Sequence, residues 1–268
     1  MKRSQLERVI NKHVGQMKKY ARQIPGSFVL EDIHELRVEY KKLRAFLRLL
    51  HPRRATYDVF IPHKLKALYH AAGEVRDTQL FLSIINTGKE LPAPQYVSCL
   101  AKQLFDSKEK LVKEIEKMDF DEVKEAIKEH LPGSMRDGTI RKFIHRKVAA
   151  IHITLLAVER IDNLHTIRKH LKDIIHNIRI FQSDWGISFP VVAWKSEKFM
   201  VDIASRLGDF NDECRALKFL HNGCSNELPV AEQQVIENWR KEREAKREEH
   251  KLQVMQQVQQ LQLVHNFK

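Results

Sequence analysis

The sequence is poor in cysteine, glycine and proline. Its three cysteines, Cys99, Cys214 and Cys224, are too few and too widely spaced for a disulfide framework or a zinc site, so we expect reduced thiols in a cytosolic compartment. Nine glycines and eight prolines, with 43% apolar and 31% charged residues, are typical of a helical protein rather than a sheet-rich or disordered one. The composition therefore predicts an all-α fold.

Long apolar runs are also absent. The longest, at residues 151–158, is interrupted by His152 and is far shorter than the roughly 18 residues needed to span a bilayer. The first five residues lead directly into a charged amphipathic pattern and lack the apolar segment of a secretory signal. We therefore expect a cytoplasmic location and no membrane partner.

What the sequence has in excess is positive charge. The 47 Lys and Arg residues outnumber the 35 Asp and Glu residues, which gives a formal net charge of +12 and a pI near 9.6. Such a field concentrates polyanions and speeds their association. We expect a negatively charged partner, which net charge alone does not identify.

Helical periodicity runs through the whole chain and is punctuated by Pro and Gly. It predicts eight helices, near residues 2–23, 30–51, 62–86, 93–117, 138–161, 163–182, 191–221 and 229–265. Short connections favour antiparallel neighbours, so we expect two antiparallel four-helix bundles, residues 1–117 and 138–268, joined by a linker at 118–137. The last helix is the most polar, and it either packs fully on the second bundle or recruits another protein.

Two segments of the first half recur in the second. Residues 33–37, IHELR, match residues 164–168, LHTIR. Residues 73–77, GEVRD, match residues 208–212, GDFND, at nearly the same separation along the chain. Two matches in the same order predict two duplicated bundles.

A cationic stripe runs along the second predicted helix of each half. At 100° per residue its members share a sector of roughly 80° beside the apolar face, and both stripes exclude carboxylates. Each stripe spans fourteen residues, about 21 Å, which suits a chain-like anion better than one phosphate group. Arg adds a planar fork that matches phosphate oxygens, and an anion would relieve the repulsion between the cations. The candidate binding residues are His34, Arg37, Lys41, Arg44, Arg48, His165, Arg168, Lys172, His176 and Arg179.

The first predicted helix of each half adds weaker candidates. For each of them a solvated helix face explains the charge as well as a phosphate contact does. They are Arg8, Lys12, Lys19, Lys142, His145 and Arg146. A polyanion beside His34 and His165 would favour their protonated form, so we expect binding to strengthen toward mildly acid pH.

Residues 34–44, HELRVEYKKLR, and 207–212, LGDFND, resemble the conserved histidine α-helical domain, CHAD, and the resemblance covers nearly the whole chain. The family pattern His-x-x-Arg-x-x-x-Lys/Arg, followed on the next helix by Gly-x-x-x-Asp, occurs here twice. The resemblance implies two four-helix bundles related by internal pseudo-twofold symmetry, with basic helices around a central groove that binds inorganic polyphosphate through the stripe residues. It also implies association with polyphosphate granules and a triphosphate-tunnel enzyme as a candidate partner. Ile175 departs from the pattern where Arg44 stands in the first half, so the second stripe would depend on His176.

The Gly-x-x-x-Asp pattern needs its own interpretation. Gly73 and Gly208 lie inside helical patterns, where Gly costs about 1 kcal/mol relative to Ala, so we expect each to permit close helix packing. Asp77 and Asp212 either hold basic side chains of the stripe in place or cap a helix. A catalytic role for them is the least expected.

Two other functions are alternatives. A metal-dependent polyphosphate hydrolase or kinase lacks support, because the sequence has no phosphate-cradling Gly-rich loop, no His-Glu-x-x-His, and no tight carboxylate cluster beyond residues 74–77 and 209–212. We therefore expect no catalysis, no cofactor and no metal. General polyanion or RNA binding is compatible with the positive charge of the chain. Aromatic residues, however, are not interleaved with the stripes as the stacking of RNA bases would require.

Overall fold

The protein is all-helical, as its composition and periodicity predicted. The structure is a computed structural model that describes residues 1–51, 60–87, 93–186, 195–222 and 228–262. Within these ranges no strand forms and none of the helices is long and apolar enough to cross a membrane. The helices of the described ranges are α1 Arg3–Ser27, α2 Leu30–Leu50, α3 His63–Thr87, α4 Pro94–Glu116, α5 Phe120–Glu129, α6 Asp137–Leu155, α7 Ile161–Trp185, α8 Glu197–Asn222 and α9 Val230–Gln259.

The helix α5 lies in residues 118–137, where the sequence had predicted only a linker. Asp119 begins it, because its carboxylate accepts hydrogen bonds from the backbone nitrogens of Asp121, at 2.9 Å, and Glu122, at 3.0 Å. Such a cap satisfies two of the four amide donors that a helix leaves free at its first turn. The other helices agree with the predicted ones to within six residues at either end. Residues 191–194 of the seventh predicted helix and residues 263–265 of the eighth lie outside the described ranges.

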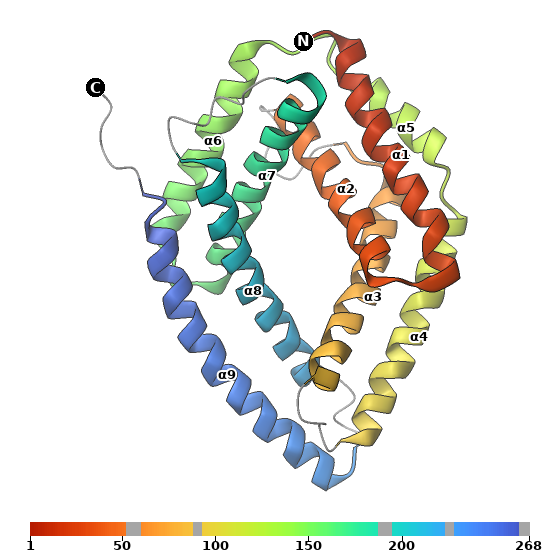
Figure 1. Ribbon diagram of the computed structural model, residues 1–268, viewed down its shortest axis with the longest axis vertical. Helices are drawn as coiled ribbons and strands as arrows, with labels where there is room; N and C mark the ends of the chain where they lie inside the picture. The colour runs from red at the N-terminus through yellow and green to blue at the C-terminus, as the bar shows by residue number, and fades with distance from the viewer. Residues whose placement is uncertain (52–59, 88–92, 187–194, 223–227, 263–268) are drawn as a thin grey trace.

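α2, α3, α7 and α8 are the inner helices. α2 packs against α1, α3 and α7, while α8 packs against α3, α7 and α9. In Figure 1, α1 and α4 lie outside α2 and α3 on one side, and α6 and α9 lie outside α7 and α8 on the other. The two helices that carry the predicted stripes, α2 and α7, are therefore direct neighbours.

Two apolar clusters hold this arrangement. The larger joins α1, α2 and α5 to α6 and α7, and its buried residues include Leu36 of α2 and Ile167 of α7. The smaller joins α3 and α4 to α8 and α9 through residues such as Phe81 and Tyr96. Burying each such side chain stabilises the fold by about 1.5 to 3 kcal/mol. Glu232 of α9 adds a polar link, because its carboxylate accepts the backbone N–H of Tyr96 at 3.0 Å, in the first turn of α4.

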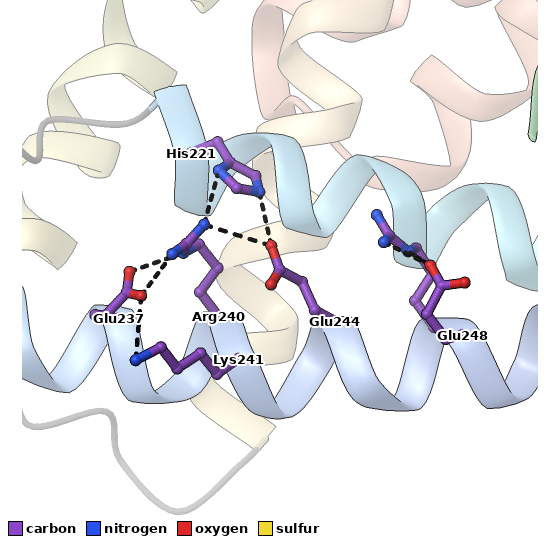
Figure 2. Close-up of polar contacts among 7 residues, drawn as sticks. His221, Glu237, Arg240, Lys241, Glu244 and Glu248 are labelled. Atoms are coloured by element: carbon purple, nitrogen blue, oxygen red, sulfur yellow. Dashed lines mark hydrogen bonds and ion pairs between the residues drawn. The ribbon is translucent and has the colours of Figure 1, made fainter.

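The charged stretch of α9 is neutralised largely by ion pairs. Arg240 lies 3.4 Å from Glu244, and Lys241 lies 3.6 Å from Glu237 (Figure 2). His221, near the end of α8, lies 3.1 Å from Glu244, so the same network joins α8 to α9. α9 therefore packs along α8, and most of its paired cations differ from those of the two stripes in having carboxylate partners on the same helix.

The cysteines differ from the expectation. Cys99 of α4 is disulfide-bonded, whereas Cys214 of α8 is free. The prediction of reduced thiols is thus wrong for Cys99, because spacing along the chain does not report which thiols the fold brings together. Cys224 lies outside the described residues.

Candidate anion-binding site

Lys41 of α2 lies among cations from three helices. The charges that act on its ammonium group are those of Arg37 and Arg44 on the same helix, Arg168 of α7 and Arg215 of α8. Burial lowers the pKa of Lys41 to about 7, and the repulsion from these arginines adds to the effect. Within the described ranges, no carboxylate lies within ion-pair distance of Lys41 or of the guanidinium groups of Arg37 and Arg168. The stripes of α2 and α7 therefore meet in a site of uncompensated positive charge.

Arg37 is held in place by α3. It is 5% exposed, and its Nη1 donates a hydrogen bond of 2.8 Å to the backbone oxygen of Tyr69. Its Cζ lies 4.5 Å from the centroid of the Tyr69 ring, within cation–π distance. The guanidinium group also lies directly against Gly73, in the space that a β-carbon there would fill. Gly73 thus leaves room for the side chain of Arg37, and not only for the close packing of helices that the sequence predicted.

Arg168 has the same relationship to α8. Its Nη2 lies 3.2 Å from the position of a β-carbon built on Gly208. Burial lowers the pKa of Arg168 from its usual value, and the nearby carboxylate of Asp212 opposes that shift. The two halves therefore repeat a contact between the arginine of the stripe and the glycine of the following inner helix.

Two tyrosines lie beside the basic residues. The rings of Tyr40 and Tyr69 stack with centroids 4.1 Å apart, and the Cζ of Arg44 lies 5.6 Å from the Tyr40 ring. The sequence pattern did not reveal this, because Tyr69 is on a different helix from the stripe. Tyr40 is buried within the protein, so this ring serves to position the arginines and is closed to an incoming base.

The histidines of the stripes are largely buried. Burial, followed by the charges of Lys169 and Arg168, lowers the pKa of His165 to about 4. His176 is 8% exposed, and burial together with the charge of Lys172 lowers its pKa to about 3. Both are therefore neutral at neutral pH in the free protein. The Nδ1 atoms of His34 and His165 are buried and have no hydrogen-bond partner among the described residues.

Arg48, at the end of the first stripe, is already paired. Its Nη1 donates to both carboxylate oxygens of Asp173 in α7, at 3.2 and 3.0 Å. Lys147 of α6 donates to the same carboxylate at 2.6 Å. Asp173 is 4% exposed, and burial raises its pKa, but these two cations outweigh burial and the net pKa is lowered. This group joins α2, α6 and α7 and leaves Arg48 less available to a ligand than Lys41.

The family model of the CHAD domain matches residues 8–221, which is most of the chain. This chain belongs to the CHAD domain family. It is similar to the crystal structure of the CHAD domain from the plant Ricinus communis, with a TM-score of 0.74 and 14% identity over 97% of this chain and 92% of that one. At that identity the likeness shows the CHAD fold. No curated protein matches the sequence.

Arg179, at the end of the second CHAD stripe, is exposed and lies 3.0 Å from Glu197 of α8. Lys172 is partly buried, and burial, followed by the charges of Arg168 and Arg179, lowers its pKa. Of the stripe residues, Lys41, Arg44, Arg168 and Lys172 thus remain without an ion-pair partner within the described ranges, as does the buried Arg37.

The weaker candidates lie on outer faces of the CHAD fold. On α1 and α6 these side chains point away from the buried faces, which pack against α2 and α7. Lys12 forms an ion pair with Asp184 at the end of α7. The exposed candidates are Arg8, Lys12, Lys19, Lys142, His145 and Arg146. The structure does not bring them to Lys41, and their part in binding stays a prediction.

Three basic residues beside the CHAD site were missed by the sequence reasoning. Arg215 acts on Lys41, His165 and Arg168, and Lys169 acts on His165. Arg76 of α3 lies near the carboxylates of Asp212 and Asp77. Lys169 falls outside the sector of the stripe, while Arg76 and Arg215 are on α3 and α8, where the repeat had drawn attention only to Gly and Asp. Among the described residues, no group of three or more His, Cys, Asp or Glu is placed to hold a metal ion.

Proposed function

We propose that this CHAD protein binds inorganic polyphosphate, without acting on it, at the site where α2, α7 and α8 meet. The observation that carries the proposal is that Lys41 has arginine neighbours on all three helices, and those on α2 and α7 have no ion-pair partner among the described residues. A multivalent anion would supply the missing negative charge and return Lys41 to its protonated form. An anion held there would also cross the boundary between the two halves of the chain.

A chain of phosphates suits this site better than a single phosphate. The guanidinium groups of Arg44 and Arg168 have no ion-pair partner among the described residues, and their buried Nε atoms have no hydrogen-bond partner there, so neither group is committed to a protein carboxylate. Arg donors in a planar fork match phosphate oxygens, and such charge-assisted bonds are about twice as strong as neutral ones. These guanidinium groups come from α2 and α7, and a linear anion can use both.

The repeated contacts support a pseudo-twofold arrangement of two four-helix bundles as part of this proposal. Arg37 lies against Gly73 and Arg168 lies against Gly208, each pairing a stripe helix with the inner helix that follows it. The stripe helices α2 and α7 pack against one another, as two equivalent elements beside a twofold axis would. Binding at that axis would place the ligand between equivalent arginines.

The test compares two double variants with the same change in charge. Arg37→Glu with Lys41→Glu alters the site, and Lys102→Glu with Lys113→Glu alters the exposed face of α4. Titration calorimetry with long-chain polyphosphate should show loss of binding for the first pair and an affinity within about threefold of the wild type for the second. Circular dichroism would check that both variants keep their helicity.

Equal losses in both variants would mean that net charge, and not this site, controls binding. Displacement of polyphosphate by single-stranded RNA at equal phosphate concentration would instead indicate a general polyanion surface. Release of orthophosphate in the presence of Mg²⁺ or Mn²⁺ would contradict the non-catalytic part of the proposal.

A further inference from the structure

We propose that Arg215 is a further binding residue of this site, and that Asp77 holds it in the free protein until a polyanion displaces the carboxylate. This inference rests on the proposed function. In the free protein the Nη1 of Arg215 donates a hydrogen bond of 2.8 Å to Oδ1 of Asp77. The pair links α8 to α3, the inner helices of opposite halves.

The position of Arg215 on α8 directs it toward the stripes. Gly208, Asp212 and Arg215 stand at positions i, i+4 and i+7, so they share one face of the helix. Gly208 is the residue against which Arg168 packs, and Arg215 lies two turns farther along, about 10.5 Å by helical rise. The same face of α8 therefore contacts Arg168 of the stripe at Gly208 and carries a second arginine, Arg215.

The two halves of the chain carry arginines at different positions around the site. When the match of IHELR with LHTIR is continued along the helix, Ile175 is the counterpart of Arg44, and Ile175 is buried in the core. When the match of GEVRD with GDFND is continued, Leu80 is the counterpart of Arg215. Arg44 thus has no arginine counterpart in the second half and Arg215 has none in the first, and both of these arginines act on Lys41. Arg215 supplies from α8 the charge that α7 lacks at position 175.

The ion pair between Arg215 and Asp77 is weak enough for a phosphate group to replace the carboxylate. The side chains of Arg215 and Asp77 are 38% and 27% exposed, so water screens their attraction. Pairs of this kind contribute little to stability. A polyanion presents several phosphate groups to the same guanidinium group and outcompetes one half-exposed carboxylate. In the free protein Asp77 thus takes the place of the ligand and keeps Arg215 in position.

The experiment measures the affinity for long-chain polyphosphate and its dependence on salt in a set of variants. Arg215→Leu introduces the residue found at the equivalent position of the first half, and Asp77→Asn removes the competing charge. A double variant joins the two changes. Arg206→Leu is the matched control, because Arg206 is exposed on the opposite face of α8 and carries the same charge.

We expect Arg215→Leu to weaken binding about five- to twentyfold and to lower the slope of log affinity against log salt by about one. Asp77→Asn should strengthen binding about threefold or more, since Arg215 no longer has to leave a carboxylate. In the double variant Asp77→Asn should have no further effect on affinity, because Arg215 is no longer present. Arg206→Leu should stay close to the wild type, and Arg215→Lys should fall between the wild type and Arg215→Leu.

Two results would overturn the inference while leaving the proposed function intact. One is an Arg215→Leu variant that binds like Arg206→Leu while Arg37→Glu with Lys41→Glu still abolishes binding. The other is weaker binding by Asp77→Asn with an unchanged thermal melting temperature, which would make Asp77 a supporting residue and not a competitor. Failure of the wild type itself to bind polyphosphate would refute the proposed function and this inference together.

Discussion

The guanidinium group of Arg37 occupies the space that a side chain on residue 73 would need. A β-carbon built on Gly73 collides with Nη1 of Arg37. Because Arg37 is buried and bonded to the backbone oxygen of Tyr69, it cannot withdraw without losing that contact. The glycine on α3 therefore fixes where the charge of α2 is held.

Gly73→Ala should displace Arg37 and so weaken both the fold and the site. Alanine favours a helix over glycine by about 1 kcal/mol, but breaking a buried hydrogen bond to a charged group costs about 1.5 to 3 kcal/mol. We expect a net loss of about 0.5 to 2 kcal/mol in the free energy of unfolding, measured in urea, and weaker polyphosphate binding.

Two other glycines are controls for that substitution. Gly15 lies inside α1 with nothing within 4 Å of an added β-carbon, so Gly15→Ala should stabilise the protein by about 0.5 to 1 kcal/mol. Gly208→Ala meets Arg168 at 3.2 Å, which a small shift relieves, so its net effect should lie between the other two. A Gly73→Ala variant as stable as Gly15→Ala would refute the account of Arg37.

Polyphosphate binding should take up a proton at Lys41. The pKa of this group is about 7 in the free protein, and a bound polyanion raises it by favouring the charged form. Above pH 7 the bound state then holds more protons than the free state, so affinity falls as pH rises, by at most about tenfold per pH unit for one proton. Calorimetry at pH 8 in two buffers of different ionisation enthalpy counts the protons taken up.

Lys41→Arg is the control for this linkage, because arginine stays protonated over the whole range. It should bind polyphosphate with little proton uptake at pH 8. His165, with a pKa of about 4 in the free protein, contributes a separate strengthening only at acid pH. Equal proton uptake by the wild type and by Lys41→Arg would assign the linkage to another group.

Removing the charge of Lys41 should stabilise the free protein. Its pKa is 10.5 in the unfolded reference and about 7 in the fold, so between these values the unfolded chain binds more protons and stability rises with pH. The destabilising contribution of the buried Lys41 charge is fully present below pH 7 and is lost near pH 10.5. We expect Lys41→Met to raise the free energy of unfolding by about 1 to 3 kcal/mol at pH 6 and to have little effect near pH 10.5. A variant less stable than the wild type at pH 6 would contradict this.

The buried carboxylate of Asp173 should be essential to the fold. Asp173→Ala leaves Arg48 and Lys147 without their common partner, and breaking a buried pair in this way costs about 3 to 5 kcal/mol. The exposed pair of Lys64 and Glu122, 3.0 Å apart, is the comparison, and Glu122→Ala should cost less than about 1 kcal/mol. Urea unfolding of both variants would measure the difference, and equal costs would show that Asp173 is not structurally special.

The sequence was sufficient to predict an all-α protein and to place the basic residues on one side of each stripe helix, because helical periodicity and the sector of a stripe depend on one helix at a time. Interactions between helices were not accessible in this way. Both stripes exclude carboxylates along their own helix, yet Arg48 meets Asp173 and Arg179 meets Glu197 from neighbouring helices. For the same reason the contribution of Arg215, on a helix without a stripe, could only come from the structure.

Chain length offers the most direct test of the central claim, that the meeting stripes bind a linear polyphosphate. Titration calorimetry would compare triphosphate, medium-chain and long-chain polyphosphate at two salt concentrations, with single-stranded RNA as a competitor. Affinity should rise with chain length to a plateau and fall steeply with salt, and RNA should not displace the long chain. Triphosphate binding as tightly as the long chain, or ready displacement by RNA, would contradict the account.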